Sequence, residues 1–300
     1  MNGLELYKNN LAVIEASWQS LPDKPEETPD STLRALWFFA AETPRAVTRV
    51  DGNNLPELTG KQEEVLSQLV QQRMSGTPLA YITGRQEFMG FEFLSAPGAM
   101  IPRKETEILG HAAVQVVKQT AHDRGQIKVL DLCTGSGNLA LVLAKEEPAC
   151  QVTGVDLSPE AVELARRNAD FLNLNERVDF TCGDLFQPFD NDNYFGFFDV
   201  ITCNPPYISS AHVKQMPAEI SGFEPELAFD GGPFGIKIPM RLIKDAPRFL
   251  KAGSWLCFEV GLGQGKGLQR SIQNNPAYQS VQPYLDEQGE IRALTAQTNY

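Results

Sequence analysis

The stretch "VLDLCTGSGNLALVLA", residues 129 to 144, contains the pattern on which the fold assignment depends. An apolar run ends at Leu132, two glycines stand in the turn at residues 134 to 137, and a second apolar run follows directly. Glycine lets the backbone approach a ligand closely, and the first N–H groups of a helix have no partner within it. The stretch predicts a buried strand, a ligand-binding loop and a helix. Its G-x-G-x-x-A form, ending at Ala140, indicates no particular ligand by itself.

The sequence on either side continues this alternation of strand and helix. Apolar segments predict strands at residues 127–132, 151–157, 178–184, 198–203 and 254–260, and amphipathic segments predict helices at residues 138–147, 158–173 and 240–250. Such alternation is typical of a parallel sheet that is covered on both faces. The last segment, "SVQPYLDEQGEIRALTA", predicts two strands joined by a turn at Gln288-Gly289. We therefore expect a mostly parallel α/β sheet with an antiparallel C-terminal end.

The N-terminal part of the chain has a different pattern. In "DSTLRALWFFAAE" we expect a helix that begins at an Asp30 or Ser31 cap, and in "TGKQEEVLSQLVQQRMSG" Thr59 and Gln62 form a capping-box pattern. The apolar stripe of this second helix comprises Val65, Leu66, Leu69, Val70 and Met74. The glycine- and proline-rich "EFMGFEFLSAPGAMIP" then predicts a hairpin. We expect a helical domain at residues 1–85, a hairpin linker at 86–104 and a catalytic domain at 105–300.

Composition argues against several classes of function. The formal net charge of −12 opposes binding to nucleic acid phosphates, so we expect no stable nucleic acid partner unless a local basic patch exists. The five cysteines form no C-x-x-C pair and the three histidines are scattered, so we predict neither a disulfide framework nor a metal site. The start has no basic leader and no apolar run reaches about 20 residues, which predicts a cytoplasmic protein without a membrane segment.

Three aspartates at predicted strand ends suggest the kind of cofactor. Asp156 ends the second strand, where an acid accepts hydrogen bonds from a ribose diol, and this favours an adenosine-containing cofactor. Asp131 offers an acid to a cationic amino-acid tail such as that of methionine. Asp184 is placed to accept from an adenine amino group, with Leu185 against the ring. These residues favour S-adenosylmethionine over a dinucleotide.

The fourth predicted strand ends in "NPPY", residues 204 to 207. Pro205 and Pro206 have no N–H and a fixed φ, so their segment is stiff and its carbonyls are available as acceptors. The Asn204 side-chain oxygen beside a proline carbonyl makes a pair of acceptors for the two hydrogens of a planar –NH₂ group, with Tyr207 against its flat face. The segment predicts a clamp for an amino or amide nitrogen, although Asn-Pro also begins ordinary turns.

Taken with the glycine loop, "NPPY" resembles the class I S-adenosylmethionine-dependent methyltransferases that act on planar nitrogen. The segments "PLAYITGRQEFMGFEF", "IPRKETEIL", "FEPELAFDGG" and "DEQGEIR" are similar to one branch, the HemK/PrmC glutamine N5-methyltransferases of peptide chain release factors. The resemblance spans nearly the whole chain and implies a Rossmann-like sheet with a small helical N-terminal domain and a release factor as the substrate; we also expect a monomer. It implies cofactor contacts at Cys133, Thr134, Gly135, Ser136, Gly137, Asp156, Asp184 and Leu185, to which we add Asp131 and Asn204. It implies substrate contacts, which we take as catalytic, at Asn204, Pro205, Pro206 and Tyr207.

The chain departs from this family's pattern at several positions. Cys133 stands where the family usually has glycine, Lys104 stands where proline is common, and Pro239 lies in a segment that diverges after Gly232. These changes bear on the substrate more than on the reaction. A methyltransferase of the same branch that acts on another peptide or a small amine, a nucleic-acid methyltransferase and a non-catalytic adenosine-binding module remain as alternatives.

Overall fold

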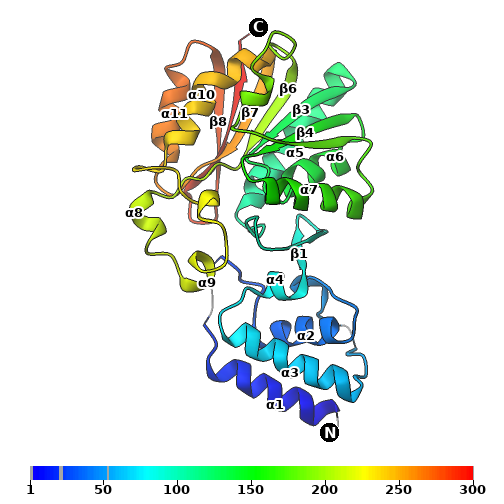
Figure 1. Ribbon diagram of the computed structural model, residues 1–300. Helices are drawn as coiled ribbons and strands as arrows, with labels where there is room; N and C mark the ends of the chain where they lie inside the picture. Colours follow the sequence, from blue (N-terminus) through cyan, green and yellow to red (C-terminus); the bar gives the residue numbers. More distant parts are fainter. Residues whose placement is uncertain (1–2, 20–22, 53, 300) are drawn as a thin grey trace. The chain divides into compact units, whose positions relative to one another are not determined.

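A computed structural model describes residues 3–19, 23–52 and 54–299, and these form two compact units (Figure 1). Unit 1 contains Met1–Pro97, Ile101–Lys104 and Pro217–Glu224. Unit 2 contains Gly98–Met100, Glu105–Met216 and Pro225–Tyr300. Each unit is thus assembled from three stretches of the sequence. The functional domain boundaries expected at residues 85 and 105 stay a prediction.

Unit 1 is built from helices and one hairpin. Its elements are α1 (Gly3–Ala16), α2 (Pro29–Ala40), η1 (Val47–Arg49), α3 (Gly60–Met74), α4 (Leu79–Thr83), β1 (Arg85–Phe88), β2 (Phe91–Leu94) and α9 (Ala218–Ser221). β1 and β2 pair antiparallel, as the hairpin prediction required. The helices enclose an apolar core that includes Leu33, Leu36 and Leu66, all fully buried. In α1 and α3 the buried residues come from one side of the helix, as helical periodicity predicts, whereas α2 is buried around most of its circumference.

The helix starts in unit 1 follow local capping chemistry. α2 begins two or three residues earlier than expected, because Thr28 is the N-cap, Pro29 is the first helical residue and Ser31 completes a capping box as the third. The prediction of an Asp30 or Ser31 cap was therefore wrong. The capping box of Thr59 with Gln62 at α3 is confirmed. Within the predicted stripe of α3, Val65 is exposed, whereas the other apolar positions are buried or packed against the core.

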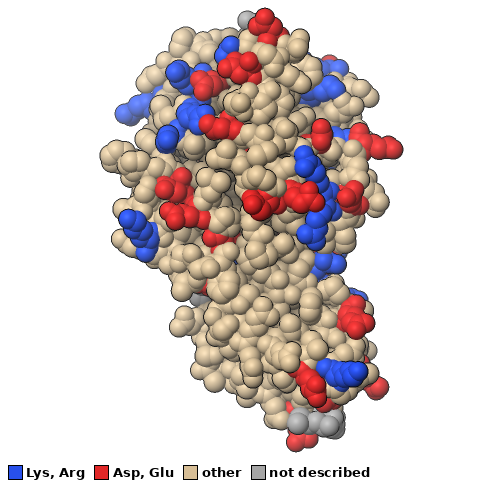
Figure 2. All heavy atoms as spheres, viewed as in Figure 1, with Lys and Arg blue, Asp and Glu red and all other residues tan. Residues whose placement is uncertain are grey.

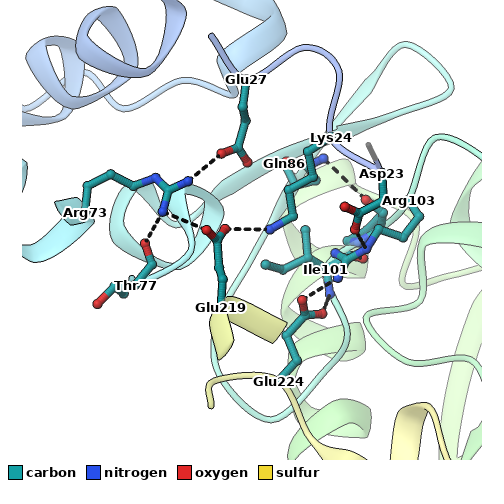
Figure 3. Close-up of polar contacts among 11 residues, drawn as sticks. Asp23, Lys24, Glu27, Arg73, Thr77, Gln86, Ile101, Arg103, Glu219 and Glu224 are labelled. Carbon is teal, nitrogen blue, oxygen red and sulfur yellow. Dashed lines mark hydrogen bonds and ion pairs between the residues drawn. The ribbon is translucent and has the colours of Figure 1, made fainter. Parts of the chain in front are cut away.

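A buried set of ion pairs fastens the segment Pro217–Glu224 into unit 1 (Figure 3). Glu219 contacts Lys24 Nζ at 3.0 Å and Arg73 Nη1 at 2.9 Å. The second contact set centres on Glu224, whose Oε2 accepts from the Ile101 backbone N–H at 2.9 Å and whose Oε1 pairs with Arg103. Residues far apart in sequence therefore neutralise each other's charge, as buried ions require.

Unit 2 contains a seven-stranded sheet in the order β5-β4-β3-β6-β7-β9-β8. Its strands are β3 (Ile127–Leu132), β4 (Cys150–Asp156), β5 (Val178–Cys182), β6 (Phe198–Cys203), β7 (Leu250–Glu259), β8 (Tyr278–Leu285) and β9 (Ile291–Thr298). β9 runs antiparallel to both of its neighbours, β7 and β8, and the other pairings are parallel. The predicted mostly parallel sheet with an antiparallel C-terminal end is confirmed.

Helices cover both faces of this sheet (Figure 1). On one face α6 (Asn138–Glu146) contacts both α5 (Thr106–Arg124) and α7 (Pro159–Leu172), and on the other face α10 (Lys237–Phe249) contacts α11 (Gly265–Gln273). The shorter elements are η2 (Gln187–Phe189), α8 (Ser210–Val213) and η3 (Glu226–Ala228). Leu130, Phe249 and Phe258 belong to a buried core between the sheet and its cover. This packing places the carboxyl ends of β3, β4, β5 and β6 along one edge, where ligands bind in open α/β sheets.

Candidate active site

Unit 2 has a cavity of about 400 Å³ at the carboxyl ends of these strands. It is lined by most of the residues singled out in the sequence, namely Asp131, Cys133, Thr134, Gly135, Ser136, Asp156, Asp184, Leu185, Asn204 and Pro206. Gly137, Pro205 and Tyr207 are next to lining residues in the chain but are not among the lining residues. The fold therefore brings four separate segments of the sequence to one cavity. The roles of the individual residues stay predictions.

The loop after β3 has a backbone shape that favours glycine. Cys133, Gly135 and Gly137 have φ values of 54°, 56° and 79°, which lie in the left-handed region. A Cβ at Gly137 would stand 2.8 Å from the Phe180 ring, so only glycine fits there without rearrangement. Cys133 adopts the same conformation with a side chain, which explains why glycine is the expected residue at its position. The tight turn directs the start of α6 at the cavity.

Asp156 is tied to this loop as well as to the cavity. Its Oδ2 accepts from the Gly135 N–H at 2.8 Å, and its Oδ1 accepts from the Ser158 N–H at 3.0 Å. Burial raises the pKa of Asp156, and these backbone hydrogen bonds oppose the rise. Because each carboxylate oxygen has more than one lone pair, the group can accept further hydrogen bonds from a ligand.

Asp131 lies at the end of β3 with only 1% of its surface exposed. The hydroxyls of Thr134 and Thr202 donate to its two oxygens, each at 2.6 Å. Burial is the main cause that raises the pKa of Asp131 to about 6, and these hydroxyls oppose the rise. The carboxyl group is therefore oriented by its neighbours while it borders the cavity, as a group that receives a cationic ligand should be.

Asp184 has a partner that the sequence did not indicate. The Arg241 guanidinium, from α10, donates to Asp184 Oδ1 at 3.0 Å and to Oδ2 at 3.1 Å, and both residues line the cavity. Leu185 is buried and has a φ of 49°. The ion pair fixes the Asp184 carboxylate beside the cavity. Each of its oxygens keeps a lone pair that can accept another hydrogen bond.

The segment of residues 204 to 207 follows β6 directly. Asn204 donates through Nδ2 to the Thr106 hydroxyl at 3.1 Å, so its amide oxygen points the other way. The Tyr207 hydroxyl donates to Glu259 Oε1 at 2.8 Å, and the Tyr207 carbonyl accepts from Gln264 Nε2 at 2.9 Å. Burial raises the pKa of Tyr207 well above its ordinary value. The segment is thus held by side chains from α5, β7 and the residue before α11.

Fold and site together define the class of protein. A family model described as a methyltransferase domain matches residues 123–292, which is more than half of the chain. The crystal structure of a methyltransferase from Pyrococcus furiosus shares the fold, with a TM-score of 0.50 and 19% identity over 71% of this chain and 91% of that chain. The chain is a methyltransferase.

Relatives of similar length specify the family. A release factor glutamine methyltransferase of Rhodopirellula baltica is 33% identical over 288 residues, which cover 96% of this chain and 95% of the relative. One from Koribacter versatilis is 38% identical over 237 residues, covering 78% of this chain and 81% of the relative. The chain belongs to the release factor glutamine methyltransferase family, which confirms the resemblance seen in its motifs.

The remaining features concern membrane-spanning helices, metal sites and surface charge. Among the residues that the structure describes, no helix is long and apolar enough to cross a membrane, and no group of histidine, cysteine and acidic side chains is arranged to hold a metal ion. On the face drawn in Figure 2, lysine and arginine side chains occur in small groups beside acidic ones.

Proposed function

We propose that this chain transfers the methyl group of S-adenosylmethionine to the side-chain amide nitrogen (N5) of a glutamine in the Gly-Gly-Gln loop of a peptide chain release factor. Membership of the family supports the substrate. The observation that carries the chemistry is the position of Asn204, which borders the cavity with its amide nitrogen held by Thr106. Release factors act in the cytoplasm, and we place the protein there as a monomer.

The residues around the cavity suit S-adenosylmethionine. Asp131 would receive the ammonium group, Asp156 the ribose hydroxyls, and Asp184 with Leu185 the adenine ring. The glycine loop would let the backbone approach the ligand closely. A volume of about 400 Å³ is of the size that small-molecule ligands occupy. When bound, this cofactor supplies a methyl group on a positively charged sulfonium.

The protein's own contribution to the reaction is to hold the acceptor nitrogen. An amide nitrogen is a poor nucleophile because its lone pair is delocalised into the carbonyl. Asn204 Oδ1 and the Pro205 carbonyl would accept the two N–H groups, which orients the nitrogen and stabilises positive charge as it develops on it. The Tyr207 ring would lie against the flat amide face. The proton then leaves to water, since the segment supplies no dedicated base.

A release factor is a folded protein, and recognition of its loop calls for more surface than one glutamine provides. We assign that task to the helical unit, as the sequence pattern of residues 1–85 suggested. A nucleic-acid substrate is disfavoured by the net charge of −12.

Mass spectrometry of an intact release factor tests the proposal. The factor is incubated with the protein and S-adenosylmethionine, alongside the same factor with its Gly-Gly-Gln glutamine replaced by alanine and the protein with Asn204→Ala. One added methyl group on the unchanged factor alone, and only with the unchanged protein, is the expected result. Equal methylation of both factors, or methylation of tRNA or a small amine in place of the factor, would defeat the proposal.

A further inference from the structure

Two polar contacts hold the side chains of the predicted clamp. Asn204 Nδ2 donates to the Thr106 hydroxyl at 3.1 Å, and the Tyr207 hydroxyl donates to Glu259 Oε1 at 2.8 Å. Thr106 also lines the cavity. Thr106 is the first residue of α5 and Glu259 the last of β7, and their exposed fractions are 2% and 1%.

The contact with Thr106 determines which end of the Asn204 amide reaches the cavity. A primary amide has an acceptor oxygen and a donor –NH₂ group at opposite ends. A clamp for a substrate –NH₂ group needs the oxygen on the cavity side, because two –NH₂ groups facing each other have no acceptor between them. Thr106 accepts from the Asn204 nitrogen and so fixes the productive orientation.

Glu259 in turn holds the other end of the clamp. Its Oε1 accepts from the Tyr207 hydroxyl at 2.8 Å, which ties Tyr207 to the end of β7. Burial raises the pKa of Glu259 to about 7, while the Thr106 and Tyr207 hydroxyls oppose the rise, Glu105 adds to it and Arg292 lowers it.

We propose that Thr106 and Glu259 are positioning residues for methyl transfer: Thr106 acts through the Asn204 amide, and Glu259 acts through the Tyr207 hydroxyl. This inference rests on the proposed function for its effect on turnover. The orientation of Asn204 can be measured without any substrate, so a failure of this inference can be distinguished from a failure of the proposed function.

The first measurement is NMR of the protein labelled with ¹⁵N at asparagine, in which Asn204→Ala identifies the Asn204 side-chain signal. Thr106→Val removes the hydroxyl and keeps the shape, so that signal is expected to shift and its amide protons to exchange faster. Thr106→Ser keeps the hydroxyl and should retain the signal. Thr120→Val is the matched control, because Thr120 lies buried in the same helix and its hydroxyl donates to the Val116 carbonyl at 2.7 Å. An Asn204 signal that Thr106→Val leaves unchanged would overturn the inference, whether or not release factors are methylated.

The second measurement is turnover on a release factor. With Thr106→Val, kcat is expected to fall on the order of 10- to 100-fold, while cofactor affinity and melting temperature stay near those of the unchanged protein. Thr106→Ser and Thr120→Val should retain kcat within about twofold. Glu259→Gln replaces the carboxyl that accepts from the Tyr207 hydroxyl by an amide and should also lower kcat. The double variant of Glu259→Gln and Tyr207→Phe should lose no more than the more damaging single one, because both act on the same hydrogen bond, and losses that multiply would mean independent structural roles and refute the inference.

Discussion

The buried ion pair of Arg103 and Glu224 should contribute strongly to the stability of unit 1. The burial of both side chains determines the size of the expected effect. Their side chains are 6% and 0% exposed, and Glu224 also accepts from the Ile101 N–H. In Glu224→Gln the amide oxygen can keep the Ile101 contact, but the guanidinium loses one of its two charged partners and keeps Asp23 at 3.0 Å. Breaking a buried pair on one side costs about 3–5 kcal/mol, and because Asp23 still neutralises part of the charge we expect the free energy of unfolding of unit 1 to fall by about 3 kcal/mol, the lower end of that range.

The matched control is Glu146→Gln, which breaks the pair of Lys118 and Glu146 on the surface of unit 2. Those side chains are 48% and 36% exposed, so the expected loss is about 0–1 kcal/mol. Urea unfolding followed by tryptophan fluorescence separates the units. Trp18 and Trp37 lie in unit 1 and report Glu224→Gln once Trp255→Phe removes the third tryptophan, whereas Trp255, in unit 2, is kept to report the control. A loss below about 1 kcal/mol for Glu224→Gln, or one equal to that of the control, would refute the reasoning.

Three further predictions concern the cavity. Asp156→Ala should weaken S-adenosylmethionine binding by about 1–3 kcal/mol in calorimetry, since it removes the ribose acceptor, and unchanged affinity would refute that assignment. Asn204→Ala should leave cofactor affinity nearly unchanged while methyl transfer is lost, and near-normal turnover would show that the clamp is wrong. Because the pKa of Asp131 is about 6, its charge is lost as the pH falls through that value, so cofactor affinity should be lower at pH 5 than at pH 7.5. Asp131→Asn should weaken binding at pH 7.5 and flatten this dependence; an unaltered pH profile in that variant would contradict the role of Asp131.

Much of unit 2 could be predicted because its strands are continuous apolar runs with glycine-bearing ends. The strand that ends at Leu132, the hairpin at Gln288-Gly289 and the order of strands and helices are found where they were expected. Two of the longer helices of unit 2, α5 and α11, were not predicted. α11 contains Gly265 and Gly267, which are poor helix formers, so its formation depends on packing against the sheet.

The residues of the candidate site that could be predicted are those at or directly after the ends of strands. Asp131, Asp156 and Asn204 meet at one cavity because the carboxyl ends of parallel strands share one edge of the sheet. Thr106 and Glu259 were missed as members of the site, since they reach it from the start of a helix and the end of a distant strand. The one available signal was an acid at the end of the apolar segment "SWLCFEV", where an unpaired charge would be costly.

The excursion of Pro217–Glu224 into unit 1 has a practical consequence for anyone who wishes to divide this protein. A cut near residue 105 yields a C-terminal fragment that still carries Glu219 and Glu224 but has lost Lys24, Arg73 and Arg103, the cations that neutralise them. Poor methylation by such a fragment would follow from the loss of the helical unit and equally from the two acids left without their cations, and the assay does not separate these causes. A chimaera between two relatives faces the same difficulty, because three stretches of sequence must be exchanged together for the charges to match. The helical unit is therefore built from several segments of the chain and should not be treated as an N-terminal extension that can be removed.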